Sequence, residues 1–241
     1  WLDDIRTWQA PNPKDDGLSL LKATLEEFSG RFGKIGAELG REMSIRMPVI
    51  DLLKLRETTS AEILDGSPAI WDMRINKTLA EIDHIQHICN ITSDAFNELK
   101  NNIKIGDTER DVVNKLQIDI LSRGGDASPY MPAISGPGGI AQIVCGPRDR
   151  VLEIGDILFI DTGSTYDGYF CDFDRNFAIG NISSEAEKVQ DILWLATEAG
   201  INASVPGSTL EDIWLSINKI IEEGGSIGNN VGRMGHSFGL Q

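Results

Sequence analysis

This chain of 241 residues is long enough for one large domain or two smaller ones, and its 41% hydrophobic and 24% charged residues are typical of a soluble globular protein. A net charge of −15 without a basic stripe excludes a nucleic-acid-binding role. The sequence contains no run of about 18 apolar residues, so we expect no membrane-spanning helix. Three widely spaced cysteines, Cys89, Cys145 and Cys171, favour a reduced, cytoplasmic setting.

Residues 1–76 have the pattern of the end of a small α/β unit. Residues 31–39 have strand character, and residues 47–57 have a helix pattern with Pro48 near the first turn. Residues 61–75 contain two apolar runs separated by an Asp65–Gly66 turn. The order strand, helix, strand predicts an α/β unit whose beginning lies before Trp1. The chain also lacks an initiator Met, so we expect it to be part of a longer protein.

A long amphipathic helix is predicted after residue 76, because apolar residues recur there close to a 3.6-residue period. They are Leu79, Ile82, Ile85, Ile88, Cys89, Ala95, Phe96 and Leu99. His84 and His87 lie mainly off this stripe, and their i, i+3 spacing is compatible with a metal site. No nearby carboxylate pattern favours a metal, so we expect solvated histidines.

Two later segments, 105–125 and 205–225, resemble each other. Each has a Gly turn, an amphipathic helix and a Gly-Gly end, and the second is one residue shorter before its Gly-Gly. At an offset of 101 residues, Gly106, Thr108, Asp111, Val112 and Leu116 match Gly207, Thr209, Asp212, Ile213 and Ile217. The repeat favours a duplicated domain with pseudo-twofold symmetry. The alternative is that many unrelated helices begin with G-x-T and end with Gly-Gly.

Capping boxes are predicted at two helix starts, from Ser208 with Glu211 and from Ser184 with Glu187 in the helix pattern of 181–200. Between the repeats lie a Gly/Pro-rich stretch, 128–139, and then strands, the longest of which follows a Gly155–Asp156 turn. The order helix, helix, strands, helix, helix, strand predicts an α+β domain whose helices cover one face of an antiparallel sheet.

A hairpin predicted over 156–178 brings acidic side chains together. If residues 166–167 form its two-residue loop, Asp161 faces Asp172; if residues 167–168 form it, Asp161 faces Asp174. In both cases like charges meet, which destabilises a sheet unless a cation or a shared proton offsets them. The hairpin therefore predicts a site for a divalent metal ion.

His236, in the Gly-rich segment 232–239, is the candidate that would shift this site toward transition metals, because carboxylates alone suit Mg²⁺ or Ca²⁺. A lone histidine among glycines is more often structural. The acid pair upstream favours the ligand role instead.

The stretch "IDTGSTYDGYFCD" followed by Gly-His resembles the creatinase/aminopeptidase metallohydrolases, which share the pita-bread fold. Asp161 and Asp172 are 11 residues apart, as the first and second metal ligands of that family are, and Asp172 opens the D-x-x-R pattern common in its prolidase-like members. The resemblance covers roughly residues 77–241. The preceding unit resembles the end of a creatinase-type N-terminal domain, which points to the Xaa-Pro or creatinase branch.

The resemblance implies an α+β pita-bread domain over 77–241, cut short at its C-terminal end, and the C-terminal part of an N-terminal α/β domain over 1–76. It makes Asp161 a ligand of one metal, Asp172 a bridge between two, and His236 a ligand of the other. Arg175 would orient the carboxylates. It also implies two divalent ions (Mn²⁺, Co²⁺, Zn²⁺ or Fe²⁺) and a homodimer.

Two glutamates that complete the site in the family would lie beyond Gln241, so the chain as given is expected to hold metal weakly or not at all. A histidine that family peptidases carry shortly before the Gly-Asp strand has no counterpart in "AQIVCGPRDRVLEIGD", where Cys145 or Gly146 stands near its place. Without that histidine, peptide cleavage would lose the help of a general acid–base group, which typically raises a rate by about 10²–10⁴-fold. The expected function is a metal-dependent hydrolase of a small peptide or another C–N bonded compound. The alternatives are a catalytically inactive binding scaffold and a creatinase-like or lyase enzyme.

Overall fold

A computed structural model describes residues 3–140, 142, 145–226 and 233–240 of the chain. The chain divides into two compact units, Trp1–Asn76 and Lys77–Gln241. Among the described residues, no helix is both long enough and apolar enough to cross a membrane.

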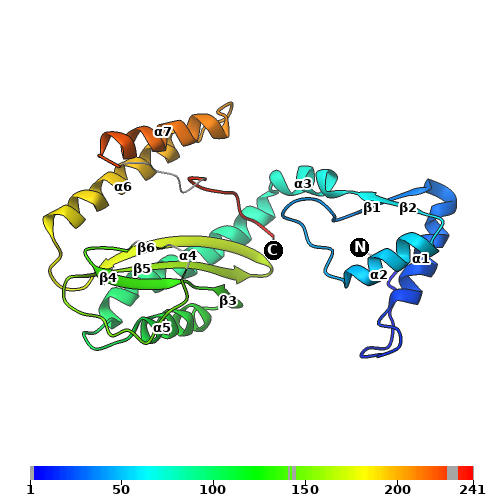
Figure 1. Ribbon diagram of the computed structural model, residues 1–241, viewed down its shortest axis with the longest axis horizontal. Coiled ribbons are helices and arrows are strands. Elements are labelled where there is room, and N and C mark those ends of the chain that lie inside the picture. The colour runs from blue at the N-terminus through cyan, green and yellow to red at the C-terminus, as the bar shows by residue number, and fades with distance from the viewer. Residues whose placement is uncertain (1–2, 141, 143–144, 227–232, 241) are drawn as a thin grey trace. The chain divides into compact units, whose positions relative to one another are not determined.

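The first unit contains a two-stranded parallel sheet and three helices (Figure 1). Its elements are α1 (Leu18–Phe32), β1 (Lys34–Ala37), α2 (Val49–Thr58), β2 (Glu62–Asp65) and α3 (Ser67–Ile75). Strands β1 and β2 pair from Lys34 opposite Glu62 to Ala37 opposite Asp65, and α2 lies between them in sequence. The second apolar run of 61–75 is helix α3, because Pro in the first turn suits a helix start. That this unit ends a creatinase-type domain stays a prediction.

The second unit combines an antiparallel sheet with four helices (Figure 1). Its helices are α4 (Leu79–Asn102), α5 (Glu109–Ser122), α6 (Ser184–Ala203) and α7 (Leu210–Glu223). Its strands are β3 (Ala127–Tyr130), β4 (Ala133–Pro137), β5 (Asp156–Tyr166) and β6 (Tyr169–Ala178). Strand β5 is central, because β3 and β4 pair with different parts of it and β6 pairs along its whole length.

Helices α4 and α5 pack on one face of this sheet and form the core with it (Figure 1). On β5, Leu158 and Ile160 point into this core, so the odd-numbered residues of the strand, which alternate with them, point to the opposite face. The predicted stripe of α4 is buried from Ile88 onward, whereas Leu79 and Ile82 in its first turns are exposed. The face opposite the helices is the one that carries the acidic side chains.

The two repeat segments have the same helix start. In α5 the Thr108 side chain accepts a hydrogen bond from the Asp111 amide while the Asp111 carboxylate accepts one from the Thr108 amide, and Thr209 and Asp212 do the same in α7. The predicted Ser208–Glu211 box is therefore wrong by one residue. The predicted box at α6 is wrong too, because Ser183 caps that helix and accepts from the Ala186 amide.

The repeats also end alike, and they keep the offset of 101 to the last turn. Gly124 and Gly225 adopt left-handed backbone conformations with φ of 102° and 95°, the conformation that ends many helices. The second copy is therefore not shorter: Gly224 takes the place of Arg123, which puts its Gly-Gly pair one position earlier. This agreement at both ends supports the predicted duplication.

Candidate metal centre

The turn of the β5–β6 hairpin decides which acids face each other. Asp167 and Gly168 have φ of 49° and 80°, and positive φ at both loop residues is the mark of a type I′ turn. Asp161 therefore pairs with Asp174, and Asp172 pairs with Gly163. The second of the two predicted registers is correct, and the register that opposes Asp161 to Asp172 is wrong.

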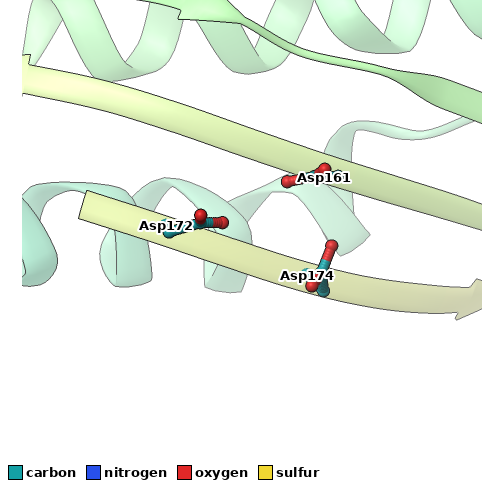
Figure 2. Close-up of side chains that lie close together, drawn as sticks. All are labelled: Asp161, Asp172 and Asp174. Carbon is teal, nitrogen blue, oxygen red and sulfur yellow. The ribbon is translucent and has the colours of Figure 1, made fainter. Parts of the chain in front are cut away.

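This register brings three carboxylates together (Figure 2). Asp172 and Asp174 are two residues apart on β6, so both lie on the face of the hairpin that carries Asp161. Each of the three offers an oxygen, and these oxygens all lie within 4.8 Å of one another. The sequence reasoning did not select Asp174 as a site residue, although one of its two registers placed it opposite Asp161.

The cluster carries negative charge that the surrounding side chains leave uncompensated. Burial, followed by the charges of Asp174 and Asp172, raises the pKa of Asp161 to about 6, although the Tyr130 hydroxyl and His236 act in the opposite direction. The pKa of Asp174 is raised as well, by burial and then by Asp172. The Oδ1 atom of Asp161 is buried and has no hydrogen-bond partner. An unpartnered carboxylate oxygen between two other carboxylates fits a bound divalent cation.

His236 lies at the edge of this cluster. Its Nε2 atom is 3.0 Å from Oδ2 of Asp172, and its Nδ1 atom is 3.0 Å from the Ser237 carbonyl oxygen. A carbonyl can only accept, so Nδ1 carries the proton of that bond and Nε2 is the ring atom that faces the acids. The segment is held against the hairpin by a hydrogen bond from the Phe170 amide to the Gly239 carbonyl, 2.9 Å long. The structure thus brings His236 to the acid cluster.

Arg175 lies on the other face of β6. Its guanidinium is 5.0 Å from the centre of the Phe173 ring and 5.9 Å from that of Phe96, and it donates to the backbone carbonyl of Asp174. Its charge lowers the pKa of Asp174, against the larger effects of burial and Asp172. The predicted role of Arg175 in orienting carboxylates stays a prediction.

Gly163 gives the site its close aromatic neighbour. A Cβ atom on this glycine would lie 1.6 Å from the Phe170 ring, so only glycine leaves room for the ring across β5. Phe170, Asp172 and Asp174 are two residues apart from one another along β6, so they lie on the same face. The Asp161-Thr162-Gly163 sequence therefore combines an acid with the space that its aromatic neighbour needs.

Comparison with known proteins gives the family of this chain. Residues 83–241 match metallopeptidase family M24. The chain belongs to this family. The predicted resemblance is thereby confirmed.

Among curated M24 relatives, the chain is 26% identical over 204 residues to the Xaa-Pro dipeptidase of Pyrococcus furiosus, which covers 84% of this chain and 58% of that protein. It is 28% identical over 227 residues to the probable dipeptidase PepE of Mycobacterium bovis, covering 94% of this chain and 58% of the relative. The chain thus spans less than two thirds of the length of these relatives.

Solved structures agree on the fold. The crystal structure of dipeptidase PepE from Mycobacterium ulcerans has a TM-score of 0.78 at 27% identity, covering 98% of this chain and 60% of that one. A dipeptidase from Pyrococcus horikoshii has a TM-score of 0.84 at 22% identity, with 98% and 63% covered, which bears on the fold alone. The predicted α+β pita-bread fold is confirmed.

The other two histidines of this M24 chain lie near the hairpin turn. The His84 ring stacks on Tyr169 with centroids 5.2 Å apart, and the His87 ring meets Tyr166 edge-on at 4.4 Å. Within the described residues, the three aspartates form the one group of three or more acidic, histidine or cysteine side chains that could share a metal ion. His84 and His87 are not members of that group. Each packs one side of its ring against a tyrosine.

The segment before β5 is held by a buried acid that the sequence did not single out. Glu109 is fully buried and accepts hydrogen bonds from the backbone and side chain of Ser135 and of Arg148. Burial alone would raise its pKa, but these bonds hold the pKa at about 2. In this M24 chain, an arginine bound to a buried glutamate thus occupies the segment in which a histidine was expected.

Proposed function

We propose that this chain is the larger part of a metal-dependent hydrolase that cleaves Xaa-Pro dipeptides or closely related peptide-like C–N bonds. Family membership supports the chemistry, and the names of the relatives from Pyrococcus furiosus and Mycobacterium bovis support a dipeptide substrate. A homodimer is part of the same proposal.

The observation that carries this proposal is the meeting of Asp161, Asp172 and His236 on one face of the hairpin, with a buried carboxylate oxygen left unpartnered. Two divalent ions would be held there, with Asp161 binding one, His236 the other, and Asp172 both. Mixed oxygen and nitrogen ligands suit Mn²⁺, Fe²⁺, Co²⁺ and Zn²⁺. Such ions supply a Lewis acid for the scissile carbonyl and lower the pKa of water.

The test uses the full-length natural protein. Metal content is measured by mass spectrometry, and hydrolysis is compared for Ala-Pro and Ala-Ala before and after treatment with a chelator. We expect stoichiometric metal, a preference for Ala-Pro, and loss of at least about 10³-fold in rate for Asp161→Asn, since removing a metal ligand removes the metal's whole contribution. Hydrolysis that survives both the chelator and Asp161→Asn would refute the proposal.

A second candidate function, action on a non-peptide C–N bond, is favoured by one observation. The segment that precedes β5 presents Arg148, bound by Glu109, in the region where a proton-transferring histidine was expected. Fold alone does not decide between such reactions. Full metal occupancy without turnover of any Xaa-Pro dipeptide would favour this candidate, whereas absence of metal would favour a binding scaffold.

A further inference from the structure

The proposed ligands Asp161, Asp172 and His236 do not explain why Asp174 lies next to them. It lies directly opposite Asp161 in the β5–β6 ladder, where facing Cβ atoms are about 4.5–5.5 Å apart. It also lies two residues along β6 from Asp172, on the same face (Figure 2). The pairing register thus adds a third acid to the cluster, and this acid is its exposed member.

The distances suit shared coordination. Two oxygens on opposite sides of one ion, each about 2.1 Å from it, are at most about 4.2 Å apart. The oxygens of Asp161, Asp172 and Asp174 already lie within 4.8 Å of one another, so shifts of less than about 1 Å each bring all three within about 2.1 Å of one ion. Side-chain torsions alone allow such shifts.

Among the described residues, no basic side chain forms an ion pair with Asp174, although the charge of Arg175 lowers its pKa. His236 contacts Asp172, while the Arg175 guanidinium rests on aromatic rings on the other face of β6. Like charges placed directly opposite in a sheet are destabilising, and Asp174 adds such a pair with Asp161. The buried Oδ1 atom of Asp161 has no partner although two other carboxylates stand next to it.

We propose that Asp174 is a third carboxylate ligand of this metal centre, so that the hairpin supplies three oxygens and the described residues supply four protein ligands with His236. The inference rests on the proposed function, because it concerns the same centre. Asp174 is exposed, so its carboxylate can turn toward an ion held by Asp161 and Asp172, and a third anionic oxygen raises the affinity for a divalent cation.

The experiment measures Mn²⁺ binding to the full-length metal-free protein by titration calorimetry and by electron paramagnetic resonance of free Mn²⁺. Asp174→Asn removes the charge and keeps the shape, whereas Asp174→Glu keeps the charge and moves the carboxylate. Asp167→Asn is the matched control, since Asp167 belongs to the same hairpin but lies at its exposed turn. Circular dichroism checks that each variant is folded.

We expect at least a 10-fold weaker Mn²⁺ affinity for both Asp174 variants and less than a 2-fold change for Asp167→Asn. If Asp174→Glu binds as well as the wild type while Asp174→Asn does not, Asp174 acts through charge alone and the ligand assignment is overturned. Unchanged binding in both Asp174 variants, with binding lost in Asp161→Asn, overturns it as well and leaves the proposed function standing. A wild type that binds none of Mn²⁺, Fe²⁺, Co²⁺ and Zn²⁺ overturns both.

Discussion

Two acidic side chains of the second unit, Glu109 and Asp161, show opposite ways of holding a carboxylate away from water. The Glu109 carboxylate accepts hydrogen bonds from Ser135 and Arg148, so its charge is compensated inside the protein. Asp161 keeps one buried oxygen unpartnered and faces two further acids. The charge of Glu109 is thus neutralised within the protein. The charge at Asp161 is offset only in part, by His236 and Tyr130, and a bound cation would neutralise the rest.

This contrast predicts a pH effect on the metal-free protein. The pKa of Asp161 is about 6 in the folded chain, above its ordinary value of 3.8, so the folded state holds this proton more tightly than the unfolded state does. Its contribution to stability is therefore fully present below pH 4 and is lost as the pH rises through about 6. The loss amounts to about 2–3 kcal/mol.

Urea unfolding of the chelator-treated protein at pH 4.5 and pH 7.5 checks this. The wild type should lose about 2 kcal/mol more than Asp161→Asn between these two pH values, because the variant has no carboxyl group to titrate there. The control Asp167→Asn should follow the wild type. Parallel losses in the wild type and in Asp161→Asn would contradict the prediction.

Glu109→Gln should destabilise the chain strongly. An amide cannot accept all the bonds that the carboxylate accepts, and it leaves the Arg148 guanidinium without its counter-charge. Since Arg148 is partly exposed, we expect about 2–4 kcal/mol, which corresponds to a fall in Tm of roughly 5–15 °C. Glu153→Gln is the control, because Glu153 is exposed and its ion pair with Arg150 is long, at 3.9 Å. Equal Tm values for the two variants would show that the buried network contributes little.

At the scale of elements, the β5–β6 hairpin depends on one close approach. In Gly163→Ala the new Cβ atom would overlap the Phe170 ring, so the ring must leave its place or β5 must bend. Overpacking of this kind costs about 1–3 kcal/mol. The cost should fall in the double variant Gly163→Ala with Phe170→Ala, because the obstructing ring is then absent.

A double-mutant cycle in urea measures the coupling between these two positions. We expect a favourable coupling of at least about 1 kcal/mol, as is usual for residues in direct contact. Gly138→Ala offers a comparison at a glycine where an added Cβ meets no atom within 4 Å, although its positive φ adds backbone strain. Strictly additive effects at 163 and 170 would mean that the ring and the glycine do not constrain each other.

Most elements of the chain could be predicted from periodicity and turn residues, whereas the exact pairing within them could not. The long helix α4 and the hairpin follow from apolar spacing and from the Asp167–Gly168 turn. Asp174 was left open because the sequence allows two turn positions, and only the backbone conformation of Asp167 distinguishes them. The N-caps were missed by one residue because two hydroxyl side chains stand next to each other at both helix starts, Ser183 and Ser184 in α6 and Ser208 and Thr209 in α7. Glu109 was missed because its partners are distant in sequence.

At the scale of the whole molecule, the division into two units predicts a local response to metal. The candidate ligands all belong to the unit 77–241, so bound metal should stabilise that unit and leave 1–76 unchanged. At a free metal concentration of 100 times Kd the gain is about 2.7 kcal/mol, or roughly 5–10 °C in the transition of that unit.

Hydrogen exchange followed by mass spectrometry locates this response. Peptides from β5 and β6 should exchange more slowly after Mn²⁺ is added to the metal-free protein, while peptides from β1 and β2 should keep their rates. Asp172→Asn should remove the difference. Slower exchange in both units would show that metal acts on the chain as a whole.

The alternation of side chains along β5 and β6 also limits how this gene can change in length. Adding or deleting a single codon inside either strand between Asp161 and Asp172 shifts the pairing register by one residue and turns acids toward α4, into the layer where Cys171 and Phe173 now pack. Carboxylates there would meet apolar neighbours without any ion to receive them. An odd indel inside a strand is therefore expected to be as harmful as the loss of a ligand, whereas extra residues at the exposed turn lengthen the loop and leave the register of the strands unchanged.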